Sequence, residues 1–415
     1  MATNPEMIAR RLPPTFAALR HRNFRLFFTG QLISLVGTWM QSVAQGWLVL
    51  QLTNSALMLG LVGAASSLPI LVLSYFGGTV ADRVSKRHLL IFTQTASMLL
   101  AFALWGLVHT GVVQTWHVMA MAMGLGTVLS FDIPARQAFV VEMVGRPDLI
   151  NAIALNSSAF NAARIFGPAL AGAIIASAGM ANCFFFNGLS FVAVIAALLA
   201  MDPRLLNGPA QGARSSFRGG LREMRAFLAS RRPLLYVLLL VSTLSVFVLP
   251  YAVLMPLVAR DVLGVGATGY GMLMSATGVG ALAGALSVAT FGRRGTRSRW
   301  IFGSSTLVAA ALLAFSFSRS FNLSLGLLFF VGLGVVIQST TSNSFLQLSV
   351  PDNMRGRIMA LFGITFMGLT PLGNLLAGVA AHFLGAPAAL SLGAATSAAV
   401  VAAVFLLAPH MRHLP

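Results

Sequence analysis

The sequence consists of apolar segments of about 20 residues or more that follow one another with short polar stretches between them. That is the length an α-helix needs to cross the hydrocarbon core of a bilayer. A helix satisfies its own backbone hydrogen bonds in lipid. The strands of a transmembrane barrel alternate apolar and polar residues, which these segments do not do. The pattern therefore predicts an all-α membrane protein.

Composition supports this prediction, because 57% of the 415 residues are hydrophobic and only 9% are charged. The mean hydropathy is +0.85. A water-soluble fold cannot bury that much apolar surface. We predict twelve transmembrane helices, over 24–50, 57–81, 89–109, 116–136, 152–177, 181–201, 233–259, 268–290, 300–318, 323–349, 358–384 and 387–408.

The segment 202–232, which is rich in Arg, Gly and Pro, separates six of these helices from the other six. We predict an N-terminal half (1–201), a cytoplasmic linker with a short amphipathic helix near 217–227, and a C-terminal half (233–415). The halves resemble an internal repeat. Aligning Gly60 with Gly271 places the bases at the end of the second helix against those at the end of the eighth. Two pseudo-symmetric six-helix halves are therefore expected.

Positive charge is distributed unevenly along the chain, which holds 27 Lys and Arg residues against 9 Asp and Glu. All of these bases except Arg164, Arg260 and Arg319 fall on one side of the membrane if both termini are cytoplasmic. Bases are retained on the cytoplasmic side of bilayers. The net charge of +18 is thus explained by topology, and we expect no nucleic-acid partner.

The stretch Gly77–Arg87 reads GGTVADRVSKR and follows the second predicted helix. It resembles the signature loop of the major facilitator superfamily, Gly-x-x-x-Asp-Arg-x-Gly-Arg-Arg/Lys, with Ser85 where glycine is usual. The alternative is a turn that is charged only because it lies in water. Three further stretches resemble the branch that contains the enterobactin exporter: 132–138 (DIPARQA), 164–172 (RIFGPALAG) and 351–357 (PDNMRGR).

This resemblance implies a secondary transporter in the bacterial plasma membrane, monomeric, exporting a small amphiphilic molecule (a siderophore, drug or secondary metabolite) in exchange for protons. A lysophospholipid or other lipid transporter of the same fold is the alternative. A membrane enzyme or sensor is a third class, but no catalytic cluster is apparent in the sequence. The histidines have no metal-ligand spacing and no phosphate-binding glycine loop occurs, so we expect no metal and no cofactor.

The resemblance also implies a gate, in which Asp82 contacts the N-terminus of helix eleven, near Arg357, and a base of helix four, here Arg136. A helix N-terminus stabilises a carboxylate, so such a contact would join the halves on the cytoplasmic side. The alternative is simple solvation of the loop. The expected gating residues are Gly78, Asp82, Arg83, Arg87, Arg136, Arg355 and Arg357.

Polar residues inside the predicted helices indicate a path for substrate or protons, because charges in membrane helices pair or line aqueous cavities. Asp132 and Arg164 fall at similar depths and are expected to be able to meet, although Asp132 could equally lie at the cytoplasmic rim. Helix one carries a polar stripe at helical spacing, whose alternative role is hydrogen bonding between helices. The expected path residues are Gln31, Thr38, Gln41, Gln45, Asp132, Asn161, Arg164, Gln338 and Thr341.

Overall fold

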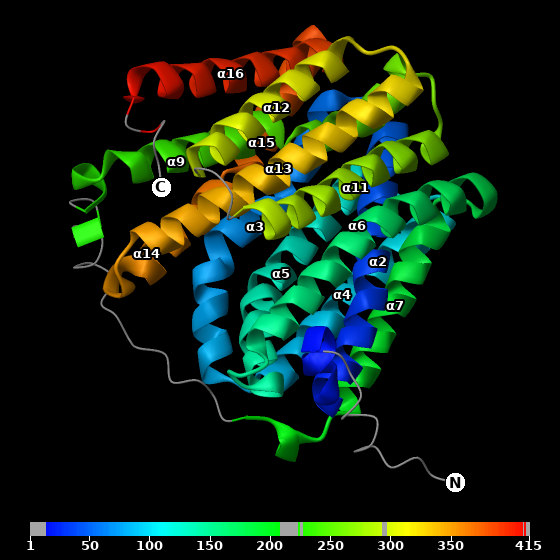
Figure 1. Cartoon of the computed structure of the whole chain (residues 1–415). Coiled ribbons are helices and arrows are strands. Elements are labelled where there is room, and N and C mark those ends of the chain that lie inside the picture. Colours follow the sequence, from blue (N-terminus) through cyan, green and yellow to red (C-terminus); the bar gives the residue numbers. More distant parts are fainter. Residues whose placement is uncertain (1–13, 208–222, 225–226, 293–296, 410, 412–415) are drawn as a thin grey trace.

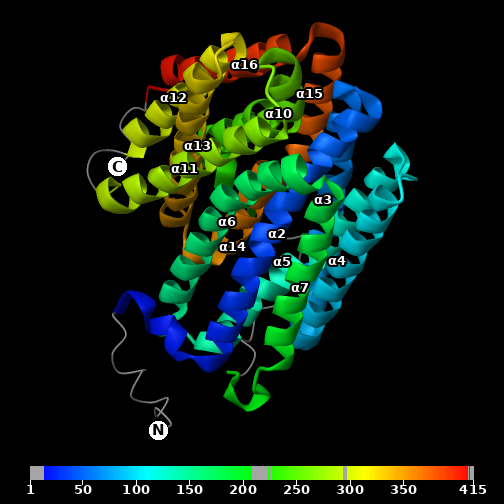
Figure 2. The same ribbon diagram turned by 90° about the vertical axis from the view of Figure 1, so that its right-hand side faces the viewer.

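The computed structural model describes residues 14–207, 223–224, 227–292, 297–409 and 411, and the regular elements that it gives these residues are helices (Figures 1 and 2). A short N-terminal helix, η1 (Pro14–Arg20), precedes the first half. The long helices of that half are α2 (Arg22–Thr53), α3 (Ala56–Arg83), α4 (Lys86–His109), α5 (Thr115–Val144), α6 (Leu149–Ala178) and α7 (Ala181–Leu199). The predicted amphipathic helix near 217–227 lies mostly outside the described residues.

The second half begins with α9 (Arg232–Thr243), which continues through η3 (Leu244–Val248), α10 (Tyr251–Leu257) and η4 (Val258–Val262) as one span. Then follow α11 (Ala267–Phe291), α12 (Arg297–Phe317) and α13 (Phe321–Ser349). The next span combines α14 (Asp352–Gly363), η5 (Ile364–Gly368) and α15 (Thr370–Leu384), and α16 (Ala386–Leu407) is the last.

Eleven of these described spans are long and apolar enough to cross a membrane. The remaining one, α2, has 32 residues, and its glutamines lower its hydropathy. The twelve predicted segments correspond to the twelve spans in order, so the prediction of an all-α membrane protein is confirmed. The two largest differences at helix ends are that helix four continues to Val144 and that helix eleven begins at Asp352. Arg136 and Arg357, at or next to the predicted ends, lie within these helices, and each has an acidic partner.

The packing of the two halves is similar. In the first, α3 packs on α5 and α4 on α7; in the second, α11 packs on α13 and α12 on α16. The halves meet where α6 contacts α11 and where α3 contacts α15. We call the two ends of the bundle the basic end, where the chain turns at 84–85, 145–148 and 350–351, and the far end, where it turns at 54–55, 179–180 and 263–266.

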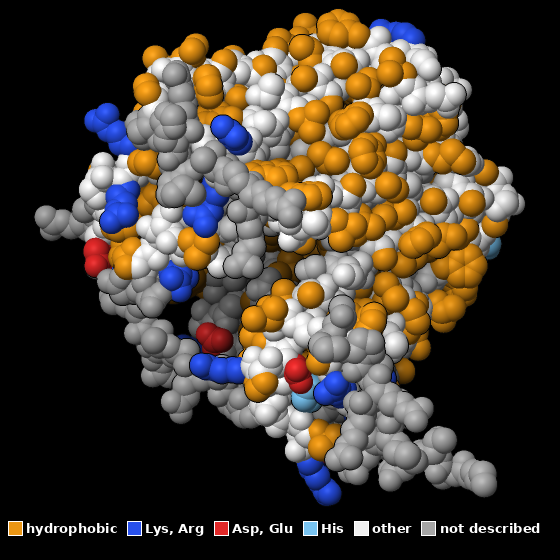
Figure 3. All heavy atoms as spheres, in the orientation of Figure 1, with side chains coloured by type: hydrophobic (Ala, Val, Ile, Leu, Met, Phe, Trp, Pro, Cys, Tyr) orange, Lys and Arg blue, Asp and Glu red, His pale blue; other side chains and the backbone are white. Residues whose placement is uncertain are grey.

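At the far end the halves touch through glycines. A Cβ on Gly271 would lie 2.3 Å from the carbonyl oxygen of Pro168, and one on Gly60 would lie 2.8 Å from the Cα of Gly378. Toward the basic end the helices of the halves diverge, as seen at the lower left of Figure 1. Figure 3 shows a hollow on that side, between the α14 region and the lower end of α3. The structure is thus closed at the far end and open at the basic end.

Candidate functional site

The carboxylate of Asp132 is the centre of a hydrogen-bonded network inside the first half. Its side chain is 1% exposed and lies 12 residues, or roughly 18 Å, before the end of α5. It accepts hydrogen bonds from Thr93 Oγ1 (2.9 Å) and Gln94 Nε2 (2.7 Å) of α4, and it pairs with Arg136 on the next turn of α5. The alternative placement of Asp132 at the cytoplasmic rim is therefore wrong.

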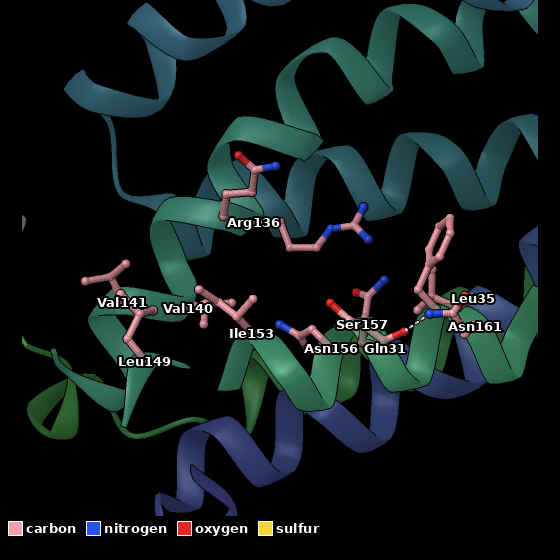
Figure 4. Close-up of a pocket in the computed structure, with 12 residues that line it drawn as sticks. Gln31, Leu35, Arg136, Val140, Val141, Leu149, Ile153, Asn156, Ser157 and Asn161 are labelled. Atoms are coloured by element: carbon pink, nitrogen blue, oxygen red, sulfur yellow. Dashed lines mark hydrogen bonds between the residues drawn. The ribbon is translucent and has the colours of Figure 1, made fainter. Parts of the chain in front are cut away.

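A cavity of about 580 Å³ lies beside this network, between α2, α5 and α6. It extends toward the basic end as far as Leu149, the first residue of α6. Figure 4 shows Arg136 extending from α5 toward the polar side chains on the opposite wall. Its polar lining comprises Gln31, Arg136, Gln137, Asn156, Ser157 and Asn161, and its apolar lining comprises Leu35, Val140, Val141, Leu149, Ile153 and Phe160.

Three polar atoms around this cavity are buried and have no hydrogen-bond partner: Gln31 Oε1, Asn156 Oδ1 and Arg136 Nε. Buried polar atoms in folded proteins are nearly always satisfied by protein, water or ligand. Two unsatisfied acceptors and one unsatisfied donor around a single cavity therefore make it a site for water or for a hydrogen-bonding ligand. The apolar side chains that each of the three helices adds to the lining suit the hydrophobic part of such a ligand.

The polar stripe of α2 has more than one environment. Gln31 lines the large cavity, whereas Gln41 accepts a hydrogen bond of 2.6 Å from Asn187 Nδ2 of α7. Thr38 Oγ1 donates to the carbonyl of Ser34 in its own helix. Gln45 lines a second cavity, of about 200 Å³, between the halves. The stripe thus borders both α7 and the interior, and Gln41 serves helix packing.

Arg164 lies in the middle of α6, next to a residue that lines the smaller cavity. Its guanidinium carbon is 5.8 Å from the centre of the Trp39 ring, which contacts the ring of Phe160 edge-on at 5.6 Å. Among the described residues no hydrogen bond or ion pair is recorded for this guanidinium. The expected meeting of Asp132 with Arg164 was wrong. Because α5 continues past residue 136, Arg136 is an i, i+4 neighbour of Asp132 and takes its place.

The residues of the expected gate are apart in this conformation. Asp82 is exposed, and no partner is recorded for it within the described residues. Arg136 pairs with Asp132 instead, and Arg357 Nη1 lies 2.5 Å from Glu223 Oε2. A Cβ added to Gly78 would meet nothing within 4 Å. The contact of Asp82 with helix eleven is therefore absent here.

The other expected residues serve their own half. Arg87 donates to the carbonyls of Leu198 (2.7 Å) and Leu199 (3.0 Å) at the end of α7, while Arg83 is exposed. Arg355 Nε donates to the carbonyl of Gln347. In the second half, Gln338 Nε2 donates to the carbonyl of Leu240 at 3.2 Å. Thr341 is buried.

Sequence reasoning missed three contributors to the site. Thr93 and Gln94 bind the Asp132 carboxylate, and Trp39 covers the Arg164 guanidinium. Thr93 and Gln94 belong to a polar run, Thr93 to Thr95, within a mainly apolar helix. Polar groups in membrane helices face protein, so this pair could have been recognised. No comparable signal marks Trp39.

A family model described as transmembrane secretion effector matches residues 14–413. The chain belongs to this family of major facilitator transporters. A staphyloferrin A transporter of Staphylococcus aureus is 24% identical over 365 residues, which cover 87% of this chain and 90% of that protein. The multidrug efflux pump Tap of Mycolicibacterium fortuitum is 28% identical over 390 residues, covering 91% of this chain and 93% of the pump.

Solved structures share the fold of this facilitator at low sequence identity. A POT family transporter in complex with 5-aminolevulinic acid has a TM-score of 0.74 at 9% identity, covering 94% of this chain and 96% of that one. A bacterial homologue of the iron transporter ferroportin has a TM-score of 0.67 at 18% identity, covering 92% and 98%. The chain is thus a multi-pass membrane transporter of small substrates and not an enzyme.

Proposed function

We propose that this facilitator exports a small amphiphilic molecule, of the siderophore, drug or secondary-metabolite kind, in exchange for protons. The observation that carries the proposal is the cavity beside Asp132, whose lining combines the unsatisfied polar atoms of Gln31, Arg136 and Asn156 with apolar side chains. The names of the relatives, a staphyloferrin A transporter and a multidrug efflux pump, support export of such molecules.

Alternating access would proceed by rocking of the halves 1–201 and 233–415 about their interface, with 202–232 as the linker of a monomer. The bias of Lys and Arg toward one side supports a topology with both termini in the cytoplasm. In that topology the basic end is cytoplasmic, and the conformation described above is the inward-open one. Substrate then enters the cavity from the cytoplasm or the inner leaflet.

Proton coupling would use the exchange of Arg136 between two acids. The helices α3 and α5 run in the same direction, and Gly77 packs on Ser130. Asp82, five residues after Gly77, therefore lies near the level of Arg136. Protonation of Asp132 would release the guanidinium, which Asp82 could then bind as the basic end closes.

The test is transport by the purified chain in proteoliposomes with an imposed pH gradient. Efflux of a fluorescent amphiphile should follow the gradient and stop when a protonophore collapses it. Asp132→Asn should uncouple efflux from the gradient, whereas Asp261→Asn, at an exposed pair near the far end, should not. Efflux that is indifferent to the gradient would contradict proton coupling. Movement of a fluorescent lysophospholipid without efflux of the soluble amphiphile would favour the lipid transporter instead.

A further inference from the structure

Arg164 carries a positive charge at mid-depth in the bundle. The residue is 15 positions from the start of α6 and 14 from its end, or roughly 20 Å from either end of the helix. It is half-buried. A guanidinium stays charged under physiological conditions, and an uncompensated charge at this depth in a membrane protein is costly. Its position therefore needs a physical explanation.

The acidic side chains of the described residues do not provide a counter-charge for Arg164. Asp132 is the one acid at comparable depth, and it is bound by Arg136, Thr93 and Gln94. The remaining described carboxylates lie near helix ends or in connecting segments, at Asp82, Glu142, Asp148, Asp202, Glu223 and Asp261. Since the charges of Asp132 and Arg136 cancel, the interior carries a net positive charge from Arg164.

The surroundings of Arg164 suit an organic ligand. The face of the Trp39 ring holds one side of the guanidinium at 5.8 Å, and Phe160 contacts the same indole. Phe160 also lines the large cavity, and Trp39 lines the smaller cavity between the halves. A molecule that moved from one cavity to the other would therefore pass Trp39 and Phe160, and the Arg164 guanidinium lies against Trp39.

We propose that the transported molecule is an amphiphilic anion whose carboxylate or similar planar oxyanion pairs with Arg164 while its apolar ring packs on Trp39 and Phe160. The inference rests on the proposed function and narrows its substrate class. A guanidinium binds a carboxylate through two parallel hydrogen bonds, and cations are disfavoured because no free acid lies beside the path in the described residues. The anion supplies the counter-charge that the protein lacks.

Three naphthalene probes with the same ring and linker, ending in a carboxylate, a hydroxyl or an ammonium group, test the proposal. The full-length protein in detergent should bind the carboxylate about tenfold or more tightly than the alcohol, as a charge-assisted hydrogen bond provides. The ammonium probe should bind most weakly. Equilibrium dialysis measures all three affinities.

Arg164→Gln should reduce the ratio of carboxylate to alcohol affinity to about one, because a neutral amide does not distinguish the two by charge. Arg164→Lys keeps the positive charge but lacks the planar guanidinium that forms two parallel hydrogen bonds, so its affinity ratio should fall but stay above one. This variant also tests the anion site if Arg164→Gln does not fold. Arg319→Gln, at the far end, is the matched control and should keep the full ratio. Trp39→Leu should weaken all three probes equally.

An unchanged ratio in Arg164→Gln, or a wild-type preference for the alcohol or the ammonium probe, would overturn the anion site. Uptake into proteoliposomes separates this inference from the proposed function. If the gradient drove transport of the alcohol and the carboxylate equally well, the proposed export function would stand and the anion site would be refuted. Preferential binding of the carboxylate without transport of any probe would support the anion site and contradict the exporter.

Discussion

The two ends of the interface between the halves are held by different interactions. At the far end, glycines bring backbones into contact: Gly271 on Pro168, Gly60 on Gly378, and Gly172 on Thr268. At the basic end, the halves diverge, and the charged residues there bind partners within one half or the linker. Arg87 binds the end of α7, and Arg357 binds Glu223.

The difference indicates which end can respond to a proton. Contacts between glycine backbones depend on shape alone, and a change of pH does not alter them. A buried acid with an arginine partner, as at Asp132 and Arg136, changes its interactions when it takes up a proton. The far end is therefore suited to close by packing, and the charged groups of the first half are suited to control when the basic end closes.

The largest expected effect follows from removing the buried acid. Asp132→Asn leaves Arg136 without its counter-charge, and breaking a buried pair costs about 3–5 kcal/mol. Thermal unfolding in detergent should show a correspondingly large loss. The double variant with Arg136→Gln should recover much of it, because no unpaired charge remains. Asp261→Asn, at an exposed pair, is the control. An equal loss of stability in Asp132→Asn and Asp261→Asn would refute the special role of the buried acid.

Gly271→Leu should disrupt the contact between the halves at the far end through a steric clash. Its Cβ would lie 2.3 Å from the carbonyl oxygen of Pro168, so the closed far end would be destabilised by roughly 1–3 kcal/mol. Transport should fall about tenfold, because 1.4 kcal/mol corresponds to a factor of ten. Gly326→Leu, where a Cβ meets nothing within 4 Å, is the matched control in proteoliposomes. Full activity of Gly271→Leu would mean that the glycine contact is dispensable.

The fold was predictable because hydropathy and segment length act on each helix separately. The same reasoning could not predict side-chain partners that depend on how two helices pack against each other. The sequence correctly placed the polar side chains of α2 on one face, yet that face borders both α7 and the interior, so Gln41 binds Asn187 while Gln31 lines the cavity. The separation of α5 from α6, which creates the cavity, follows from packing that no single segment encodes.

The error at Asp132 has a similar origin. The predicted helix ended at Arg136, four residues after Asp132, and this left a position at the cytoplasmic rim open for the acid. The structure continues α5 by two turns, because the Asp132 carboxylate compensates the charge of Arg136 inside the bundle. The pairing of an acid and a base four residues apart was visible in the sequence and predicts this continuation.

Smaller and more selective effects are expected at the open end. Asp82→Asn should slow transport several-fold and leave thermal stability in this conformation unchanged, because the exposed carboxylate has no recorded partner among the described residues. Gly78→Leu should act in the same way, since its Cβ has free space here but would obstruct closure. Gly77→Leu, whose Cβ would overlap the carbonyl of Ser130, should instead lower stability. A loss of thermal stability in Asp82→Asn would mean that this carboxylate already stabilises the open conformation.

The smallest effect is expected from the polar contact that crosses the far end. Arg260 binds Asn54 of the first half and also pairs with Asp261, at side-chain exposures of 33% and 44%. Exposed ion pairs contribute about 1 kcal/mol or less, so Arg260→Gln should change the unfolding temperature by only a few degrees. High salt should reduce this difference further, because it screens exposed charges. If Arg260→Gln impaired transport as strongly as Gly271→Leu, charge as well as packing would close the far end, and the contrast between the two ends would fail.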